Sequence, residues 1–423
     1  MTTGRQMTVG LVGFGTVGRS VARILAERRG HDLRLVGVCT RRPEARRREA
    51  QWLGTGVHWT DDIDTLLRTG AQVIVEVIGG MEPARTWIET ALRAGRSVVT
   101  ANKQVVAEHG RDLTRTARDA GCSLLFEAAV GGVVPVIRGI QQGLGSDRLT
   151  RIVGVVNGTC NFVLGQMADA RVSLDDAVIE AQARGYAEAD PSADLDGLDA
   201  RAKLSILATL GLDDHVRPSD VTAESIRALD RDDLSCAAGA GLVARQIAWA
   251  ERADDDRIGA GVLPALVGAH SWFARASGPE NVVVVTGDRS GQTVFAGQGA
   301  GGAATAIAVV SDVLAVAAGS PAAVEWPRAS GEPVHDDMVA SHYVRVRQPQ
   351  GSVAAIQPAE VLRRAGFLTE RVLTSRSTAG SSRWAAIVAP CSHQRLNRVL
   401  AELVPASGAG GGAIGLPLFD AVS

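Results

Sequence analysis

A segment in the middle of the chain gathers acidic residues around one lysine, just before a run of apolar residues. Its charged members are Glu188, Asp190, Asp194, Asp196, Asp199 and Lys203. The chain as a whole is nearly neutral, with 44 Lys and Arg against 46 Asp and Glu, so this local cluster indicates a site. Carboxylates around an ammonium group are suited to binding a charged small molecule and to moving a proton.

Asp199 and Lys203 stand four residues apart at the start of a predicted helix, whose apolar residues continue through 204–210. Both side chains therefore project from one helix face. The Asp-Pro and Asp-Gly turns within residues 190–197 would let the preceding loop curl its carboxylates around the ammonium group. Two simpler interpretations stay open: the pair is a solvated surface contact, or Asp194 and Asp196 only cap the helix.

A glycine-rich turn opens the chain, between a predicted strand at Met7–Val12 and helical apolar spacing. The turn reads Gly13-Phe14-Gly15-Thr16-Val17-Gly18. Here Gly13 permits the tight turn, Gly15 lets backbone amides approach a pyrophosphate, and Gly18 allows close packing of the helix. A second strand at Leu33–Cys39 follows, so we expect a dinucleotide-binding βαβ unit.

The second strand ends in Cys39-Thr40-Arg41-Arg42, where an NAD-specific protein usually has an acid for the ribose hydroxyls. A guanidinium suits a 2′-phosphate, so Arg41 and Arg42 favour NADP(H), with NAD(H) still possible. The same arginines, with those at 46–48, can equally form the solvated start of a helix.

Further strands are predicted at Val73–Ile78 and Ser97–Val99, each followed by helical periodicity. Ligands of open α/β sheets bind beyond the carboxyl ends of the strands. We therefore expect the residues after these strands to face the crevice of the glycine loop: Gly79, Thr100, Asn102 and Lys103. Alternatively, Lys103 is an exposed lysine at a helix start. Strands at 124–126 and 151–156 follow, and we place the change of domain close to residue 148.

Size and composition limit the possible classes of function. The 423 residues, 46% of them hydrophobic, suffice for two or three packed domains. A net charge of −2 leaves no broad basic field for nucleic acid or a membrane, which favours a small-molecule substrate. The cysteines at 39, 122, 160, 236 and 391 show neither disulfide nor zinc-site spacing. Without a signal peptide or a run of bilayer length, a cytoplasmic location is expected.

Several stretches together resemble homoserine dehydrogenase, in the same order and at similar separations. They are the glycine loop, EVIGG (76–80), TANK (100–103), EAAVGG (127–132), VNGTCNF (156–162), GYAEADPSADLDGLDARAK (185–203) and GQGAGG (297–302). The resemblance implies reversible reduction of L-aspartate 4-semialdehyde to L-homoserine with NADPH or NADH, on the route to threonine, methionine and isoleucine. Two alternatives remain: a paralogue that reduces another amino-acid semialdehyde, and an NADP-binding sensor without turnover.

The resemblance also implies roles for individual residues. Lys203 would give a proton to the nascent alkoxide during reduction or polarise it through water, and Asp199 would orient Lys203 and bind substrate. Glu188 would receive the substrate ammonium group, and Lys103 would lie near both substrate and nicotinamide. Further contacts are implied to the substrate by Asp194 and Tyr186, and to the cofactor by Gly185 and Gly301.

A monovalent cation and a homo-oligomer also follow from the resemblance. The family binds the cation in a loop between its domains. The implied ligands are Glu127 and the backbone carbonyls of Val130, Gly132 and Val134, and such oxygen ligands suit Na⁺ or K⁺ in a structural role. Dimerisation through the sheet of the catalytic domain is implied as well, so we expect a homodimer or a homotetramer.

The C-terminal region departs from the pattern of longer bacterial members, which end in a regulatory ACT module, a βαββαβ unit. Strands at 342–347, 372–375 and 384–388 and helices at 358–365 and 396–403 keep that alternation. The usual Asp-x-Pro-Gly turn is replaced by Gln348-Pro349-Gln350-Gly351, which puts threonine feedback in doubt. The glycine-rich stretch 408–412 is expected to be flexible. Cys160 replaces a common threonine and is interpreted as a small buried residue.

These observations predict an α/β protein of three domains. The first is a Rossmann-type NAD(P)-binding domain at 1–148, completed by a return helix at about 303–320. An α/β catalytic and dimerisation domain follows at 149–302. The last is a degenerate ACT-like α+β domain at 335–423.

Overall fold

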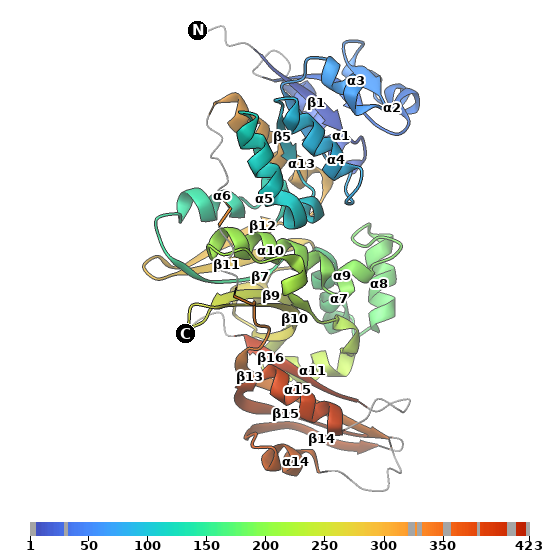
Figure 1. Ribbon diagram of the computed structural model, residues 1–423. Helices are drawn as coiled ribbons and strands as arrows, with labels where there is room; N and C mark the ends of the chain where they lie inside the picture. The colour runs from blue at the N-terminus through green and yellow to red at the C-terminus, as the bar shows by residue number, and fades with distance from the viewer. Residues whose placement is uncertain are drawn as a thin grey trace.

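The computed structural model describes residues 6–28, 33–319, 326–327, 332–349, 357–378, 381–403 and 412–419. Along an elongated molecule, the N-terminal sheet and its helices lie at one end, helices and strands of the middle of the chain follow, and the C-terminal strands lie at the other end (Figure 1). Among the helices of these ranges, none has the length and apolar character needed to cross a bilayer.

The N-terminal sheet is parallel, with strand order β3-β2-β1-β4-β5-β6. Its strands are β1 (Met7–Val12), β2 (Leu33–Cys39), β3 (His58–Thr60), β4 (Val73–Glu76), β5 (Ser97–Thr100) and β6 (Leu124–Leu125). The helices of this part are α1 (Thr16–Glu27), α2 (Pro43–Glu49), α3 (Ile63–Arg68), α4 (Ala84–Arg93) and α5 (Lys103–Asp119). This doubly wound order confirms the predicted Rossmann-type fold and places its ligand crevice where β1 and β4 diverge.

Strand β4 ends two residues earlier than the predicted strand. The carboxylate of Glu76 accepts hydrogen bonds from the backbone N–H groups of Ile78 (2.8 Å) and Gly79 (3.4 Å). These bonds turn the chain at the edge of the sheet, so Val77 and Ile78 belong to the loop that follows.

A helix late in the sequence, α13 (Gly302–Ala317), packs against α1 beside the N-terminal sheet (Figure 1). Its buried Ala306, Val309 and Val313 share a core with residues of β1 and α1. Gly302 permits the close approach, because a Cβ atom there would lie 2.7 Å from the Cγ2 atom of Thr16.

The second sheet is mixed and runs β12-β11-β7-β9-β10-β16-β13-β15-β14, with β8 beside β10. Its middle strands are β7 (Leu149–Val155), β8 (Thr222–Ala223), β9 (Leu242–Arg252), β10 (Ile258–Gly268), β11 (Glu280–Gly287) and β12 (Gly291–Gln298). The helices of this part are α6 (Val136–Arg138), α7 (Gly158–Asp169), α8 (Leu174–Ala183), α9 (Ser192–Leu195), α10 (Leu198–Gly211), α11 (Arg231–Gly239) and α12 (Trp272–Arg275). Helix α10 lies against β7, β9 and β10 and also contacts α5 of the first part.

Short helical turns complete these two parts of the chain. They are η1 (Gln51–Leu53), η2 (Glu127–Ala129), η3 (Gly139–Gly143), η4 (Pro218–Asp220) and η5 (Ile226–Ala228).

The C-terminal part has the predicted βαββα alternation, followed by one more strand. Its elements are β13 (Val339–Pro349), α14 (Pro358–Arg364), β14 (Thr369–Thr378), β15 (Ser381–Ser392), α15 (His393–Leu403) and β16 (Gly412–Phe419). The last strand was not predicted. The glycine-rich residues 408–411 lie outside the described ranges, whereas Gly412 begins β16. This strand pairs with β13 and, through Leu418 and Phe419, with the end of β10, so the two sheets are continuous.

A buried charge cluster joins the C-terminal sheet to helix α11. Asp233, 1% exposed, lies 2.6 Å from a guanidinium nitrogen of Arg383 and 3.5 Å from one of Arg345, and it accepts a hydrogen bond from the Tyr343 hydroxyl. Asp230 pairs with the same two arginines. The side chain of Tyr343 also shares an apolar core with α7, α8 and α11.

Candidate active site

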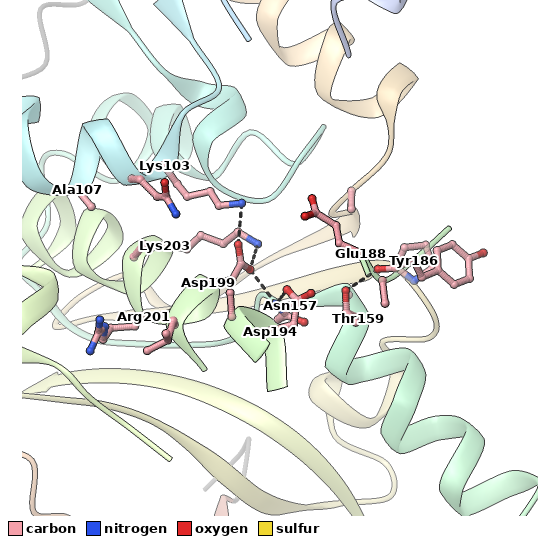
Figure 2. Close-up of a pocket in the computed structure, with 18 of the residues that line it drawn as sticks. Lys103, Ala107, Asn157, Thr159, Tyr186, Glu188, Asp194, Asp199, Arg201 and Lys203 are labelled. Carbon is pink, nitrogen blue, oxygen red and sulfur yellow. Dashed lines mark hydrogen bonds and ion pairs between the residues drawn. The ribbon is translucent and has the colours of Figure 1, made fainter. Parts of the chain in front are cut away.

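A cavity of about 1050 Å³ opens between the nucleotide-binding part and the middle of the chain. Its walls come from the start of α5, the turn between β7 and α7, the loop 185–194, helix α10 and the loop 298–301. Sequence segments that were predicted separately as functional therefore line one space. Figure 2 shows the charged side chains at its centre.

Asp199 occupies the centre of this charged group. Its Oδ1 atom lies 2.8 Å from Lys103 Nζ, and its Oδ2 atom lies 2.7 Å from Lys203 Nζ. Figure 2 shows the two lysines reaching the same carboxylate from different helices, α5 and α10. The side chains of Asp199 and Lys203 are only 10% and 12% exposed, so their i,i+4 pair is not a solvated surface contact.

The two lysines determine the ionisation of this carboxylate. Burial alone would raise the pKa of Asp199, but the charges of Lys203 and Lys103 outweigh it and hold that pKa below the usual range. In return, the charge of Asp199 raises the pKa of Lys103 against the effect of burial. Asp199 is therefore ionised and lies between the side-chain nitrogens of two lysines.

The turn after β7 supplies further contacts. Lys203 Nζ donates to the backbone carbonyl of Val156 at 2.7 Å. The side-chain amide of Asn157 donates to Asp194 at 2.7 Å and to Asp199 at 2.9 Å. Burial raises the pKa of Asp194, and the hydrogen bond from Asn157 works against that rise.

The predicted substrate residues of the loop 185–194 all line the cavity. Glu188 is exposed, and among the described residues no hydrogen bond or ion pair reaches its carboxylate. The ring of Tyr186 packs 5.0 Å from that of Phe162 and points away from the lysines (Figure 2). Asp194 and Asp196 do not cap α10, which begins after Gly197 without a side-chain cap. Cys160 is fully buried, as expected.

A second cleft, of about 820 Å³, follows the carboxyl ends of β1, β2 and β4. Its walls include six predicted cofactor residues: Gly13, Phe14, Gly15, Arg41, Arg42 and Gly79. Among the described residues, apart from Gly15 and its two chain neighbours, no atom lies within 4 Å of where a Cβ atom of Gly15 would stand, and no side chain caps the start of α1. Exposed helix N–H groups beside an open glycine suit a pyrophosphate, so these residues fit a dinucleotide.

The other predicted cofactor residues lie in the first cavity or in the turn and helix that follow β1. Gly185 and Gly301 line the first cavity, close to Lys103. Gly18 packs on Gly13, whose carbonyl oxygen would lie 2.2 Å from a Cβ atom at position 18. Thr16 and Val17 form the first turn of α1.

Thr100 is fully buried and lines neither of these two spaces. Its hydroxyl donates to Glu76 and accepts from the backbone N–H of Asn102. The Asn102 side chain in turn donates to Gly80 and caps α5, whose first residue is Lys103. Thr100 and Glu76 thus support the loops around the cofactor cleft and the position of Lys103.

The predicted cation loop lies between η2 and α6. Both carboxylate oxygens of Glu127 accept backbone N–H groups, from Ile137 (2.8 Å) and Arg138 (2.9 Å). Burial raises the pKa of Glu127 to about 7. Val130 and Gly132 are buried, and within the described residues no backbone donor reaches their carbonyl oxygens. Two buried carbonyls without a donor fit an oxygen-ligated cation.

Comparison with known proteins gives consistent matches. The family model described as "Homoserine dehydrogenase, NAD binding domain" matches residues 13–127, and that described as "Homoserine dehydrogenase" matches residues 135–314. A homoserine dehydrogenase from Synechocystis is 39% identical over 316 residues, 72% of either chain. A homoserine dehydrogenase structure from Thiobacillus denitrificans has a TM-score of 0.86 and 30% identity over 99% of both chains. A hyperthermophilic archaeal homoserine dehydrogenase in complex with NADPH has a TM-score of 0.64 and 26% identity over 75% of this chain and 99% of that one.

Proposed function

The chain belongs to the homoserine dehydrogenase family of NAD(P)-dependent oxidoreductases, and we propose that Lys203, Asp199 and Lys103 carry the acid–base part of its reaction. One observation supports this proposal above the rest. Lys103 and Lys203 are the only lysines in the sequence, which otherwise uses arginine. Both of them contact Asp199. An ammonium group can release its proton near neutral to alkaline pH, whereas a guanidinium cannot.

NADP(H), which the glycine turn and the cleft beyond β2 would hold, would supply the hydride chemistry at the carbon that bears the reacting oxygen. The chain's own residues manage the proton. In the direction of reduction, Lys203 gives a proton to the oxygen as the carbonyl becomes an alkoxide, and in oxidation the neutral amine takes the hydroxyl proton. Asp199 holds the amine of Lys203 in place, and the carbonyl of Val156 fixes it from a second direction.

Residues at the rim of the cavity would bind and orient the substrate. Glu188 has an exposed carboxylate that is available to the substrate ammonium group, with Asp194 adding negative charge beside it. Lys103 is 38% exposed and would meet both the substrate and the nicotinamide end of the cofactor. Glu188→Gln should raise the KM for homoserine and leave the Kd for the cofactor unchanged. An unchanged KM would remove Glu188 from the substrate site.

We further propose that NADP(H) is the preferred cofactor. Arg41 and Arg42 both line the cleft beyond β2, where the 2′ position of the adenosine ribose is bound in this fold. Replacing both by alanine should weaken NADP⁺ more than NAD⁺, measured as the ratio of the two Kd values. Arg93→Ala is the matched control, because Arg93 pairs with Glu89 on an exposed face. An unchanged ratio would show that these arginines are only a solvated helix start.

A monovalent cation and a homodimer complete the proposal. Na⁺ or K⁺ would be held by the carbonyls of Val130, Gly132 and Val134 together with Glu127, and would stiffen the connection between the two cavity walls. The Tm should then rise with NaCl or KCl relative to choline chloride at equal ionic strength. The edge strand β12 is the expected contact between subunits, and light scattering after size exclusion tests for a dimer or a tetramer.

A further inference from the structure

The turn that joins β7 to α7 contacts three charged side chains of the proposed active site. Val156 binds Lys203 through its carbonyl oxygen, and Asn157 binds Asp194 and Asp199 through its amide nitrogen. Figure 2 shows the Asn157 side chain between the two carboxylates. Asn157 lies in the VNGTCNF stretch that carries the family resemblance, but no role was predicted for its side chain.

Asn157 uses every polar atom of its side chain. Its Oδ1 atom accepts from the backbone N–H of Cys160 at 2.8 Å and so caps α7, and its two amide hydrogens serve the two carboxylates. These partners also fix the orientation of the amide, because an oxygen turned toward two carboxylates would have no donor. The residue is only 3% exposed, so water does not compete freely for these bonds.

The two carboxylates need such a neutral donor because they lie on either side of it and repel each other. Asp194 comes from α9 and Asp199 from α10. The charge of Asp199 is one of the causes that raise the pKa of Asp194. A bridging amide binds both oxygens without adding charge, whereas an ammonium or a carboxylate in its place would change the charge balance of the cluster.

We propose that Asn157 is a positioning residue of the reaction, which holds Asp199 toward both lysines and Asp194 toward the substrate. This inference depends on the proposed roles of Asp199 and Lys203. Asn157 does not exchange a proton with the substrate. It acts through Asp199, and the neighbouring carbonyl of Val156 holds the amine that Asp199 orients.

Two variants separate this role from helix capping. Asn157→Gly removes both amide donors but costs little as a helix cap, since glycine is tolerated there. Asn157→Asp keeps the cap and the size of the side chain and replaces the donor by a carboxyl group. Ser173→Ala is the control for cap loss, because Ser173 caps α8 and does not contact the cluster.

Asn157→Gly should lower kcat/KM for homoserine by roughly 100-fold, the loss typical of a displaced reacting group, with an unchanged Kd for NADP⁺. Ser173→Ala should lower the Tm and leave kcat/KM unchanged. Asn157→Asp should show a distinct pH profile in aspartate semialdehyde reduction. Its new carboxyl group faces Asp194 from α9, Asp199 and Lys203 from α10, Lys103 from α5 and the Cys160 thiol on α7.

The like charges of the two aspartates favour the protonated form of the new acid, which again has a hydrogen to donate. The activity of Asn157→Asp relative to wild type should therefore rise as the pH falls, while that of Asn157→Gly stays constant. A wild-type kcat/KM in Asn157→Gly, or a flat ratio for Asn157→Asp, would overturn the inference. If Asn157→Gly does not fold, the Asn157→Asp profile decides alone. Lys203→Ala measured in parallel should be inactive; if it is active, the proposed function fails independently of Asn157.

Discussion

Asp199→Asn is the substitution that tests the charge arrangement most closely. The Asp199 carboxylate accepts from Lys103 at 2.8 Å and from Lys203 at 2.7 Å. An asparagine can accept from one ammonium group but must turn its own N–H₂ toward the other. One charge-assisted contact is lost, which is worth about 1.5–3 kcal/mol. If that contact acts in the transition state, kcat/KM should fall about 10- to 150-fold.

The same substitution should change the titration of Lys103. Asp199 is the largest cause of the raised pKa of Lys103, so that pKa should fall in Asp199→Asn. A raised lysine pKa stabilises the fold at low pH, and this contribution disappears as the pH rises through the folded-state pKa. The stability difference between variant and wild type should therefore shrink toward alkaline pH.

The low lysine content of the chain makes an NMR titration of these side chains practical. Because Lys103 and Lys203 are the only lysines, isotope-labelled lysine gives two side-chain signals, and both can be titrated by NMR. Steady-state rates from pH 7 to 10 supply the kinetic profile. A Lys103 pKa that does not fall in Asp199→Asn would refute the charge arrangement. A kcat/KM within threefold of wild type would refute the role assigned to it.

Three further outcomes are expected. Gly15→Ala should bind NADP⁺ at least tenfold more weakly, because the added methyl group would occupy the open space where the pyrophosphate approaches. The Tm of the apo protein should not change, since the φ of −84° at Gly15 suits alanine. Equal affinity would place the pyrophosphate elsewhere. Asp233→Ala should lower the free energy of unfolding by about 1–3 kcal/mol, because the buried Tyr343 hydroxyl loses its acceptor and the buried Arg345 keeps only one carboxylate partner, Asp230. KM should stay unchanged, and an unchanged free energy of unfolding in urea titrations would contradict this. His342 is fully buried, and burial lowers its pKa to about 4. Below pH 6.5 the unfolded chain therefore binds more protons at this residue than the folded chain does, so the free energy of unfolding falls as the pH drops. The wild type should lose about 1.2 kcal/mol from this residue between pH 6 and pH 5 in urea titrations, and His342→Gln should lack that loss. Equal pH dependence in both would show that His342 is not the cause.

The fold was largely predictable because its strongest signals are local. Apolar runs and the glycine turn gave β1 and β2 with their observed limits. Seven strands were not predicted, namely β3, β8, β9, β10, β11, β12 and β16, and two of them show the physical reason. β3 has only three residues, too few to show a period. β16 contains glycine and proline, which disfavour strands, and depends on pairing with β13 and β10, which lie far away in sequence.

The sequence predicted the place of a site residue only where helical spacing or the end of a strand determines it. Helical periodicity placed Asp199 and Lys203 together, and the strand-end rule brought Lys103 to the crevice. The contact of Lys103 with Asp199 needs the packing of α5 on α10, which no local pattern encodes. The bridging position of Asn157 likewise arises only when α9 and α10 meet the end of β7. Thr100 was expected at the crevice, but the buried Glu76 carboxylate engages its hydroxyl instead.

The most direct test of the central claim compares wild type with Lys203→Arg and Lys203→Ala in homoserine-dependent reduction of NADP⁺ at alkaline pH. Arginine keeps the positive charge beside Asp199 but cannot release a proton. We expect both variants to lose at least 100-fold in kcat/KM and to bind NADP⁺ with wild-type affinity. Near-wild-type turnover by Lys203→Arg would contradict proton transfer at Lys203, and a wild type that binds NADP⁺ without oxidising homoserine would contradict the function itself.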